Sequence, residues 1–258
     1  MSAFPVIHPA HAETGTRPLV LLHGGNVANW MWAPQVEAFR DRLVLTPDLP
    51  GFGARTAEDW PGLDAVADDV VAQVRSAGVG GAFDLVGLSL GGVVALRLLA
   101  RHGADVPRAL VTGAPLTGVG GSARAITALQ LSLWDAAWFW RAQAAAFRLP
   151  EDAREEFVRH GLSVRKENAR AMSADVDAGR VPTGLDAYAG ALLAVAGERE
   201  PAVVRRSLAV LRAALPTART GLVPRMHHVW NVEDVPLFND VVREWMDGRM
   251  DPRIAPAD

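Results

Sequence analysis

Short apolar runs and longer amphipathic stretches alternate along most of the chain. The apolar runs have four to six residues, the length of a buried strand, and several end at loops rich in glycine or proline. These runs lie at residues 19–22, 43–46, 83–86, 109–112, 191–196 and 218–223, and helical spacing of apolar positions occupies residues 33–40, 63–77, 93–100 and the final stretch with Leu237, Val241 and Trp245. Strands separated by helices pair in parallel. We therefore expect an α/β protein with a mostly parallel central sheet flanked by helices.

The alternation stops between residues 117 and 186, where no strand pattern is present and helical patterns prevail. We therefore predict a domain built from three stretches of chain. Residues 1–116 form the first part of the α/β core, residues 117–186 form a helical cap insertion, and residues 187–258 form the second part of the core.

The predicted insertion contains an aromatic stretch, residues 131–147, which includes Trp134, Trp138, Phe139 and Trp140. Such rings either pack an insertion onto the main domain or line an apolar pocket, and different rings of one helix can do each. Trp134 and Trp138 are four residues apart and share one face of a helix. We expect these two rings to line the substrate pocket and the others to anchor the insertion.

The apolar run at residues 83–86 leads into the most informative motif of the chain, Gly87-Leu88-Ser89-Leu90-Gly91. In the pattern Gly-x-Ser-x-Gly, a sharp turn from strand to helix forces the serine into a strained backbone conformation. The two glycines lack the Cβ atoms that would otherwise collide across this turn. We therefore predict that Ser89 is a nucleophile, held exposed at the end of the sheet.

Composition and charge narrow the function further. The 258 residues include 29 acidic and 26 basic side chains, no cysteine, and no run of Lys or Arg that forms a stripe for nucleic acid or an anionic membrane. Disulfides, a thiol nucleophile and Cys-based metal sites are excluded. Because no His, Asp and Glu cluster has metal-ligand spacing, and no glycine motif joins a strand to a helix as a dinucleotide fingerprint does, we expect no metal and no other cofactor.

Residues 1–17 contain no apolar stretch of signal-peptide length, and no later segment has the about 18 consecutive apolar residues of a membrane span. We expect a soluble cytoplasmic protein whose partner is a small molecule, with no nucleic acid and no membrane involved. The pattern carries no signal for the oligomeric state.

The motifs, in their order, resemble those of the α/β-hydrolase superfamily of the type with a helical cap. The matching segments are His23-Gly24-Gly25, the loop at residues 47–53, the Ser89 motif, the insertion after Pro115, the acidic loop at residues 197–200, and His227-His228-Val229-Trp230. The resemblance covers nearly the whole chain and implies the α/β-hydrolase fold. It departs at the N-terminus, where the first clear strand begins at residue 19. The leading strands are therefore predicted to be short or missing.

A serine hydroxyl is a poor nucleophile at neutral pH and needs a base, for which histidine is the natural candidate. His23 resembles the structural histidine that precedes the oxyanion loop in this superfamily, which leaves His227 and His228. The family commonly places one residue and then an aromatic after its catalytic histidine, and Trp230 sets that register on His228. His227 then stands where the family has a small residue.

The third catalytic residue is a carboxylate that orients the histidine, and in this fold it lies between the nucleophile and the histidine in the chain. The loop after the strand at residues 191–196 offers Glu198 and Glu200. The family often has Gly-Glu-x-Asp here, which implies Glu200 as the acid and Glu198 as the preceding structural residue. Glutamate is one methylene longer than aspartate, so we expect the loop to retreat.

The oxyanion of the reaction needs preorganised hydrogen-bond donors. The resemblance implies the backbone N–H of Leu90, the residue after the nucleophile, and an N–H from the loop after His23. Gly25 is our choice for the second donor, with Asn26 as the alternative.

These residues predict a serine hydrolase that cleaves an ester or lactone of a hydrophobic small molecule through an acyl-enzyme, with Ser89, His228 and Glu200 as its catalytic triad. Two alternatives stay open at this point. One is a non-hydrolytic enzyme on the same scaffold, such as a cyclase, a lyase or a cofactor-free oxygenase, and the other is a small-molecule receptor with a degenerate triad.

Overall fold

Eight strands form one sheet within residues 6–11, 15–118 and 120–257, which are the residues that the computed structural model describes. The strands are β1 (Ile7–His8), β2 (Leu19–Leu22), β3 (Val44–Leu45), β4 (Asp84–Leu88), β5 (Arg108–Thr112), β6 (Ala191–Gly197), β7 (Arg219–Val223) and β8 (Ala255–Pro256). Their order across the sheet is β1-β3-β2-β4-β5-β6-β7-β8. The inner strands pair in parallel, and β1 and β8 pair antiparallel at the edges. The predicted mostly parallel sheet is confirmed.

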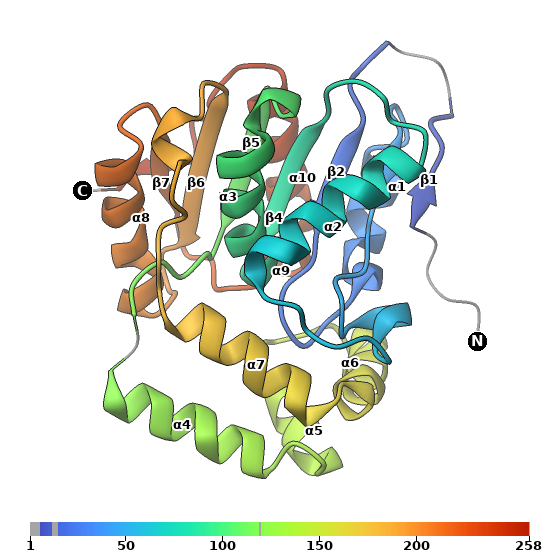
Figure 1. The fold of residues 1–258 in the computed structure, drawn as a ribbon, viewed down its shortest axis with the longest axis vertical. Helices are drawn as coiled ribbons and strands as arrows, with labels where there is room; N and C mark the ends of the chain where they lie inside the picture. Colours follow the sequence, from blue (N-terminus) through green and yellow to red (C-terminus); the bar gives the residue numbers. More distant parts are fainter. Residues whose placement is uncertain (1–5, 12–14, 119, 258) are drawn as a thin grey trace.

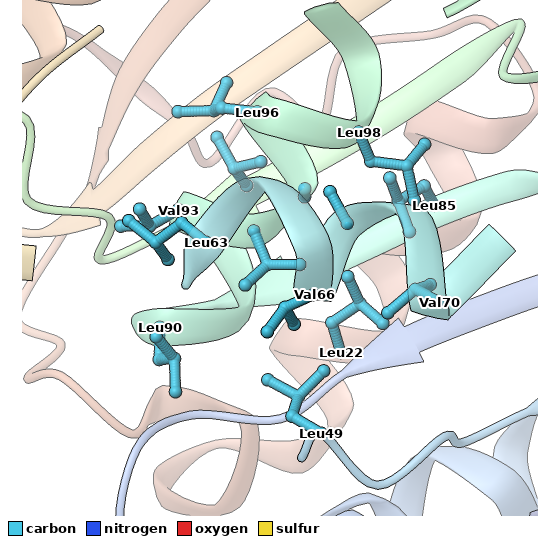
Figure 2. Close-up of a cluster of buried hydrophobic side chains, with 14 of the residues drawn as sticks. Leu22, Leu49, Leu63, Val66, Val70, Leu85, Leu90, Val93, Leu96 and Leu98 are labelled. Atoms are coloured by element: carbon cyan, nitrogen blue, oxygen red, sulfur yellow. The ribbon is translucent and has the colours of Figure 1, made fainter. Parts of the chain in front are cut away.

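Helices bury both faces of this sheet. Along β2, Val20 and Leu22 belong to one apolar cluster, and Leu19 and Leu21 belong to the other, because successive side chains of a strand point to opposite faces. The first face packs against α2 (Leu63–Ser76), α3 (Leu90–His102) and α8 (Ala202–Ala214), and the second packs against α1 (Ala33–Ala38) and α10 (Val235–Met246). Figure 1 shows α2 and α3 in front of the strands. Figure 2 shows the interlocking aliphatic side chains of the first face.

The sheet differs from the prediction mainly at its edges. The leading strand β1 is two residues long and pairs with β3, in line with the prediction of short leading strands. The edge strand β8 was not predicted, because two residues carry no periodic pattern. Helix α3 begins at Leu90, directly after Ser89, and not at residue 93. Ser89 therefore lies at the junction of β4 and α3, with no residue between it and the helix.

Four helices between β5 and β6 form a layer of their own, which we call the helical layer. It consists of α4 (Gly121–Ser132), α5 (Ala137–Ala146), α6 (Glu151–Ser163) and α7 (Lys166–Asp177), and Figure 1 shows it below the sheet. The side chain of Asn168 on α7 accepts a hydrogen bond from the backbone N–H of Trp60 and donates one to the carbonyl oxygen of Glu58. The indole of Trp60 donates to Asp175. These bonds tie the layer to the loop that precedes α2.

The aromatic segment 131–147 is not one helix, contrary to the prediction. Residues 133–136 separate α4 from α5, so Trp134 lies in the connection between them. Trp140 packs against the aromatic rings around it in this part of the helical layer. It is 1% exposed, its ring centroid is 4.6 Å from that of Trp134, and its Nε1 donates to the carbonyl oxygen of Trp134 at 2.7 Å. A Cβ at Gly161 would overlap the Trp140 ring, so α6 approaches α5 closely there.

No helix within the described residues has both the length and the apolar character needed to cross a membrane.

Candidate active site

Ser89 stands on a strained turn between β4 and α3. Its φ is 56° and its ψ is −116°, a combination that L side chains rarely adopt. A Cβ on Gly87 would overlap the carbonyl of Gly91, and a Cβ on Gly91 would overlap the carbonyl of Leu22. The backbone N–H of Ser89 donates to Thr112 on the adjacent strand β5 at 2.8 Å. The predicted geometry of the motif is therefore present, and it depends on both glycines.

His228 and Glu200 are hydrogen-bonded to each other through Nδ1 of the imidazole and Oε1 of the carboxylate. Glu200 follows β6 and is 4% exposed, and its Oε2 accepts the backbone N–H of Gly197 at 3.2 Å. A carboxylate at Nδ1 holds the proton on that nitrogen, so Nε2 is left as the proton acceptor of the ring. The pair has the arrangement of an oriented general base.

His227 and Glu198, the neighbouring candidates, make other contacts. Nδ1 of His227 lies 2.7 Å from Oε1 of Glu233, whose Oε2 accepts the backbone N–H of His227. Glu198 is exposed, and its carboxylate accepts the backbone N–H of Arg225 at 2.7 Å. The structure thus brings His228 together with Glu200 and keeps the other two residues out of that pair.

His23 is fully buried beneath the loop that follows β2. Its Nδ1 donates to the carbonyl oxygen of Gly24 at 2.8 Å, and its Nε2 accepts the backbone N–H of Leu49 at 3.0 Å. Burial lowers the pKa of His23 below its usual value, although the nearby carboxylate of Asp48 acts in the opposite direction. Because backbone groups occupy both ring nitrogens, His23 fixes the loop and has no nitrogen left to act as a base.

The loop that His23 supports carries Gly25, the predicted second oxyanion donor. Gly25 and Leu90 both line the cavity that contains Ser89, and a Cβ on Gly25 would lie 3.9 Å from the Cβ of Leu90. Asn26, the alternative, lines the same cavity with a left-handed φ of 63°. The residues whose N–H groups were predicted to bind the oxyanion therefore lie close together beside the serine.

A cavity of about 460 Å³ lies between the core and the helical layer. Ser89 and His228 line it from the core. The helical layer, with the connection between α5 and α6, contributes Phe147, Leu149, Pro150, Ala153, Glu156, Phe157, Met172 and Val176. Two ionisable side chains, Glu156 and His228, occur among the residues that line it. The walls are otherwise mostly apolar, which suits a hydrophobic, uncharged ligand of medium size.

Trp134 and Trp138 do not line this cavity, and the expectation that they do is wrong. Trp134 is buried, and its indole donates to the carbonyl oxygen of Val164, whereas Trp138 is 59% exposed. The expectation assumed one continuous helix, and the break at residues 133–136 removes the shared face. Phe147, at the end of the same aromatic segment, lines the cavity in their place.

Sequence reasoning also missed Trp30, which lines the cavity from the core. Its place, shortly after the His23-Gly24-Gly25 motif, is the one signal that points to it. Within the described residues, no group of three His, Asp or Glu side chains forms a site for a metal ion.

A model of the alpha/beta hydrolase family matches residues 19–251. A pimeloyl-[acyl-carrier protein] methyl ester esterase from Legionella pneumophila is 32% identical over 90 residues, which are 34% of this chain and 34% of that protein. The chain thus matches little more than a third of the length of its curated relatives.

Solved structures are similar over most of the chain. A thermophilic esterase from Thermogutta terrifontis has a TM-score of 0.74 and 21% identity, with 94% of this chain and 97% of that one covered. An enol-lactonase from Burkholderia xenovorans LB400 has a TM-score of 0.77 and 20% identity, with 93% and 95% covered. At this identity the likeness establishes a shared fold.

Proposed function

We propose that this chain, which belongs to the alpha/beta hydrolase family, is a serine hydrolase that cleaves an ester or lactone of a hydrophobic small molecule. Membership of the family confirms the resemblance found in the motifs, and the relatives support a hydrolase-type enzyme. The observation that carries the proposal is the hydrogen bond between His228 and Glu200 at the cavity that also contains Ser89.

In the proposed reaction, Oγ of Ser89 attacks the carbonyl carbon of the ester while Nε2 of His228 takes the hydroxyl proton. The bond between the carbonyl carbon and the alcohol oxygen then breaks, and that oxygen receives the proton from His228. A water molecule attacks the resulting acyl-enzyme and gives one proton to His228, which returns it to Ser89 as the carboxylic acid leaves. Glu200 keeps the imidazole in one orientation and stabilises its protonated form.

Negative charge develops on the carbonyl oxygen of the substrate during both steps. The backbone N–H groups of Gly25 and Leu90 are the proposed donors for it, and one such donor is worth about 3 to 4 kcal/mol in measured cases. Gly25 belongs to the loop held by His23, so the donor is fixed before substrate binds.

The lining supports a hydrophobic acyl group. Phe147, Phe157, Met172 and Val176 cover the cavity from the helical layer. We therefore propose that residues 117–186 act as a cap that shapes the acyl site. The lining residues include no Lys or Arg that would bind a highly anionic substrate, and the carboxylate of Glu156 is paired with Arg159.

Ser89→Ala tests the proposal against the matched control Ser132→Ala. Ser132 lies at the end of α4, where its hydroxyl donates to the carbonyl oxygen of Leu129. Because no other serine lies on the motif turn, we expect S89A to lose both hydrolysis of p-nitrophenyl esters and labelling by a fluorophosphonate probe. We expect its Tm to be unchanged. S132A keeps both activities. Retained turnover in S89A contradicts the proposal.

Two other results identify a different function. Wild-type labelling at Ser89 without ester hydrolysis points to a cyclase, lyase or cofactor-free oxygenase on this scaffold. Neither labelling nor hydrolysis in the wild type points to a small-molecule receptor whose serine is not activated.

A further inference from the structure

Backbone hydrogen bonds hold the loop that carries Glu200 against the segment that carries His228. The N–H of Glu200 donates to the carbonyl oxygen of Gly197 at 3.0 Å, and the N–H of Arg199 donates to that of Met226 at 3.0 Å. A Cβ on Gly197 would overlap the Met226 carbonyl, so the two segments are already in close contact. These contacts hold the loop of Glu200 and the segment of His228 together on this side of the pair.

The room for the longer acid lies on the other side of the pair, at the end of β5. Gly113 follows this strand with a φ of +65°, and its N–H donates to Val195 on β6 at 3.1 Å. A Cβ on Gly113 would lie 2.9 Å from Oε1 of Glu200, 2.9 Å from Cε1 of His228 and 3.0 Å from its Nδ1. These are the two residues of the hydrogen-bonded pair, and a carbon atom this close displaces them.

We propose that Gly113 is a positioning residue, whose missing side chain provides the space in which a glutamate reaches Nδ1 of His228. The inference rests on the proposed function, because it assigns Gly113 to the orientation of the proposed base. A side chain at this position pushes Glu200 and the imidazole together out of their places. Because general-base catalysis depends on the position of the ring, and a misplacement of about 1 Å costs about a hundredfold, a shift of about half an ångström costs about tenfold in rate.

Gly113→Ala is the direct test, and Gly78→Ala is its control. Both glycines have a left-handed φ, +65° and +87°, but a Cβ on Gly78 has nothing within 4 Å. Both variants therefore carry the backbone cost of a non-glycine residue. Only in G113A does the new Cβ press against Glu200 and His228. We expect kcat of G113A to fall about tenfold or more with KM changed less than about threefold. G78A keeps the wild-type kcat. Equal kcat in the two variants overturns the proposal.

The double variant G113A/E200D tests whether the cost comes from the length of the acid. Aspartate withdraws the carboxylate by one methylene, which relieves part of the overlap with the new Cβ. We expect Gly113→Ala to lower kcat less in the E200D background than in the wild type. Purely additive losses overturn the proposal. If G113A alone does not fold, recovered folding of the double variant supports the proposal and continued misfolding overturns it.

A measurement without turnover separates this inference from the proposed function. The Nδ1 proton of His228, shared with a buried carboxylate, gives a downfield proton resonance that is assigned by its loss in H228A. We expect this resonance in the wild type and G78A, and its loss or shift in G113A. An unchanged resonance in G113A overturns the positioning role, whereas a changed resonance in a protein that hydrolyses no ester supports it and contradicts only the proposed reaction.

Discussion

The ring of Phe147 lies 6.4 Å from the imidazole of His228, centroid to centroid, with 30° between the two planes. Phe147 follows helix α5, and His228 follows strand β7, so this contact joins the helical layer to the core at the edge of the cavity. Phe147 also meets Phe157 of α6 edge-on, with 6.1 Å between centroids. One aromatic ring therefore links two helices of the layer to the proposed base.

Phe147→Ala is predicted to change the acyl-chain preference of the enzyme. Loss of this ring removes apolar contact area worth about 2 kcal/mol, so KM for long-chain p-nitrophenyl esters rises about tenfold or more, with a smaller effect on the acetate. The matched control is Trp138→Ala, which removes an exposed aromatic side chain of α5 that does not line the cavity. A wild-type chain-length profile in F147A shows that the acyl site lies elsewhere.

His228→Ala is predicted to lower kcat/KM by about a thousandfold or more, and His227→Ala to change it far less. The reason is that Glu200 orients His228, whereas His227 is paired with Glu233 on the outside. Steady-state kinetics on one ester substrate measures both. Likewise, Glu200→Gln should lower kcat/KM more than Glu198→Gln does. Equal losses within either pair are incompatible with the assignment of the triad.

Trp140→Ala is predicted to destabilise the protein by about 3 to 5 kcal/mol, as expected for a large aromatic removed from a packed site. The ring packs edge-on against Trp134, Phe139 and Phe157, at 4.6, 5.2 and 5.7 Å between centroids. Trp138→Ala should stay within about 0.5 kcal/mol of the wild type, because its side chain is exposed. Urea unfolding measures the unfolding free energies of the two variants. Similar values refute the prediction that Trp140 anchors the helical layer by packing.

The stability of the protein is predicted to fall as the pH falls from 6.5 toward 4. His160 on α6 is buried against Trp30 and Phe52, with centroids 6.3 and 6.4 Å away. Burial and then the nearby His23 lower the pKa of His160 from 6.5 to about 4. Between these two pH values, His160 is protonated in the unfolded chain and neutral in the folded chain. This costs about 2 kcal/mol of unfolding free energy between pH 7 and pH 5, and nothing above pH 7.

The variant His160→Gln removes this titration and is the control for it. We expect the difference in unfolding free energy between pH 7 and pH 5 to shrink by about 2 kcal/mol relative to the wild type. Part of the pH dependence remains, because burial also lowers the pKa of His23. An undiminished difference in H160Q means that His160 is not the group that titrates.

The sequence by itself determined the features that depend on neighbouring residues. Apolar runs of four to six residues predicted the parallel strands, because a strand buried on both faces is almost continuously apolar. The pattern Gly-x-Ser-x-Gly predicted the strained φ of Ser89, because the overlap that Gly87 avoids, with the carbonyl of Gly91, arises at the turn itself. The overlap that Gly91 avoids is with Leu22 on a different strand. The order of the motifs also indicated the family, which the match over residues 19–251 establishes.

Only the tertiary structure decided which side chains from distant parts of the chain are in contact. Residues 133–136 contain no glycine or proline, so the sequence carries no local signal for the interruption between α4 and α5. At this interruption the indole of Trp140 donates a hydrogen bond to the carbonyl oxygen of Trp134. The space beside Glu200 comes from Gly113, which directly follows β5 and lies eighty-odd residues earlier in the chain. Periodicity tells which residues share a face, but the partner of that face depends on packing between distant segments, and this packing decided the lining of the cavity.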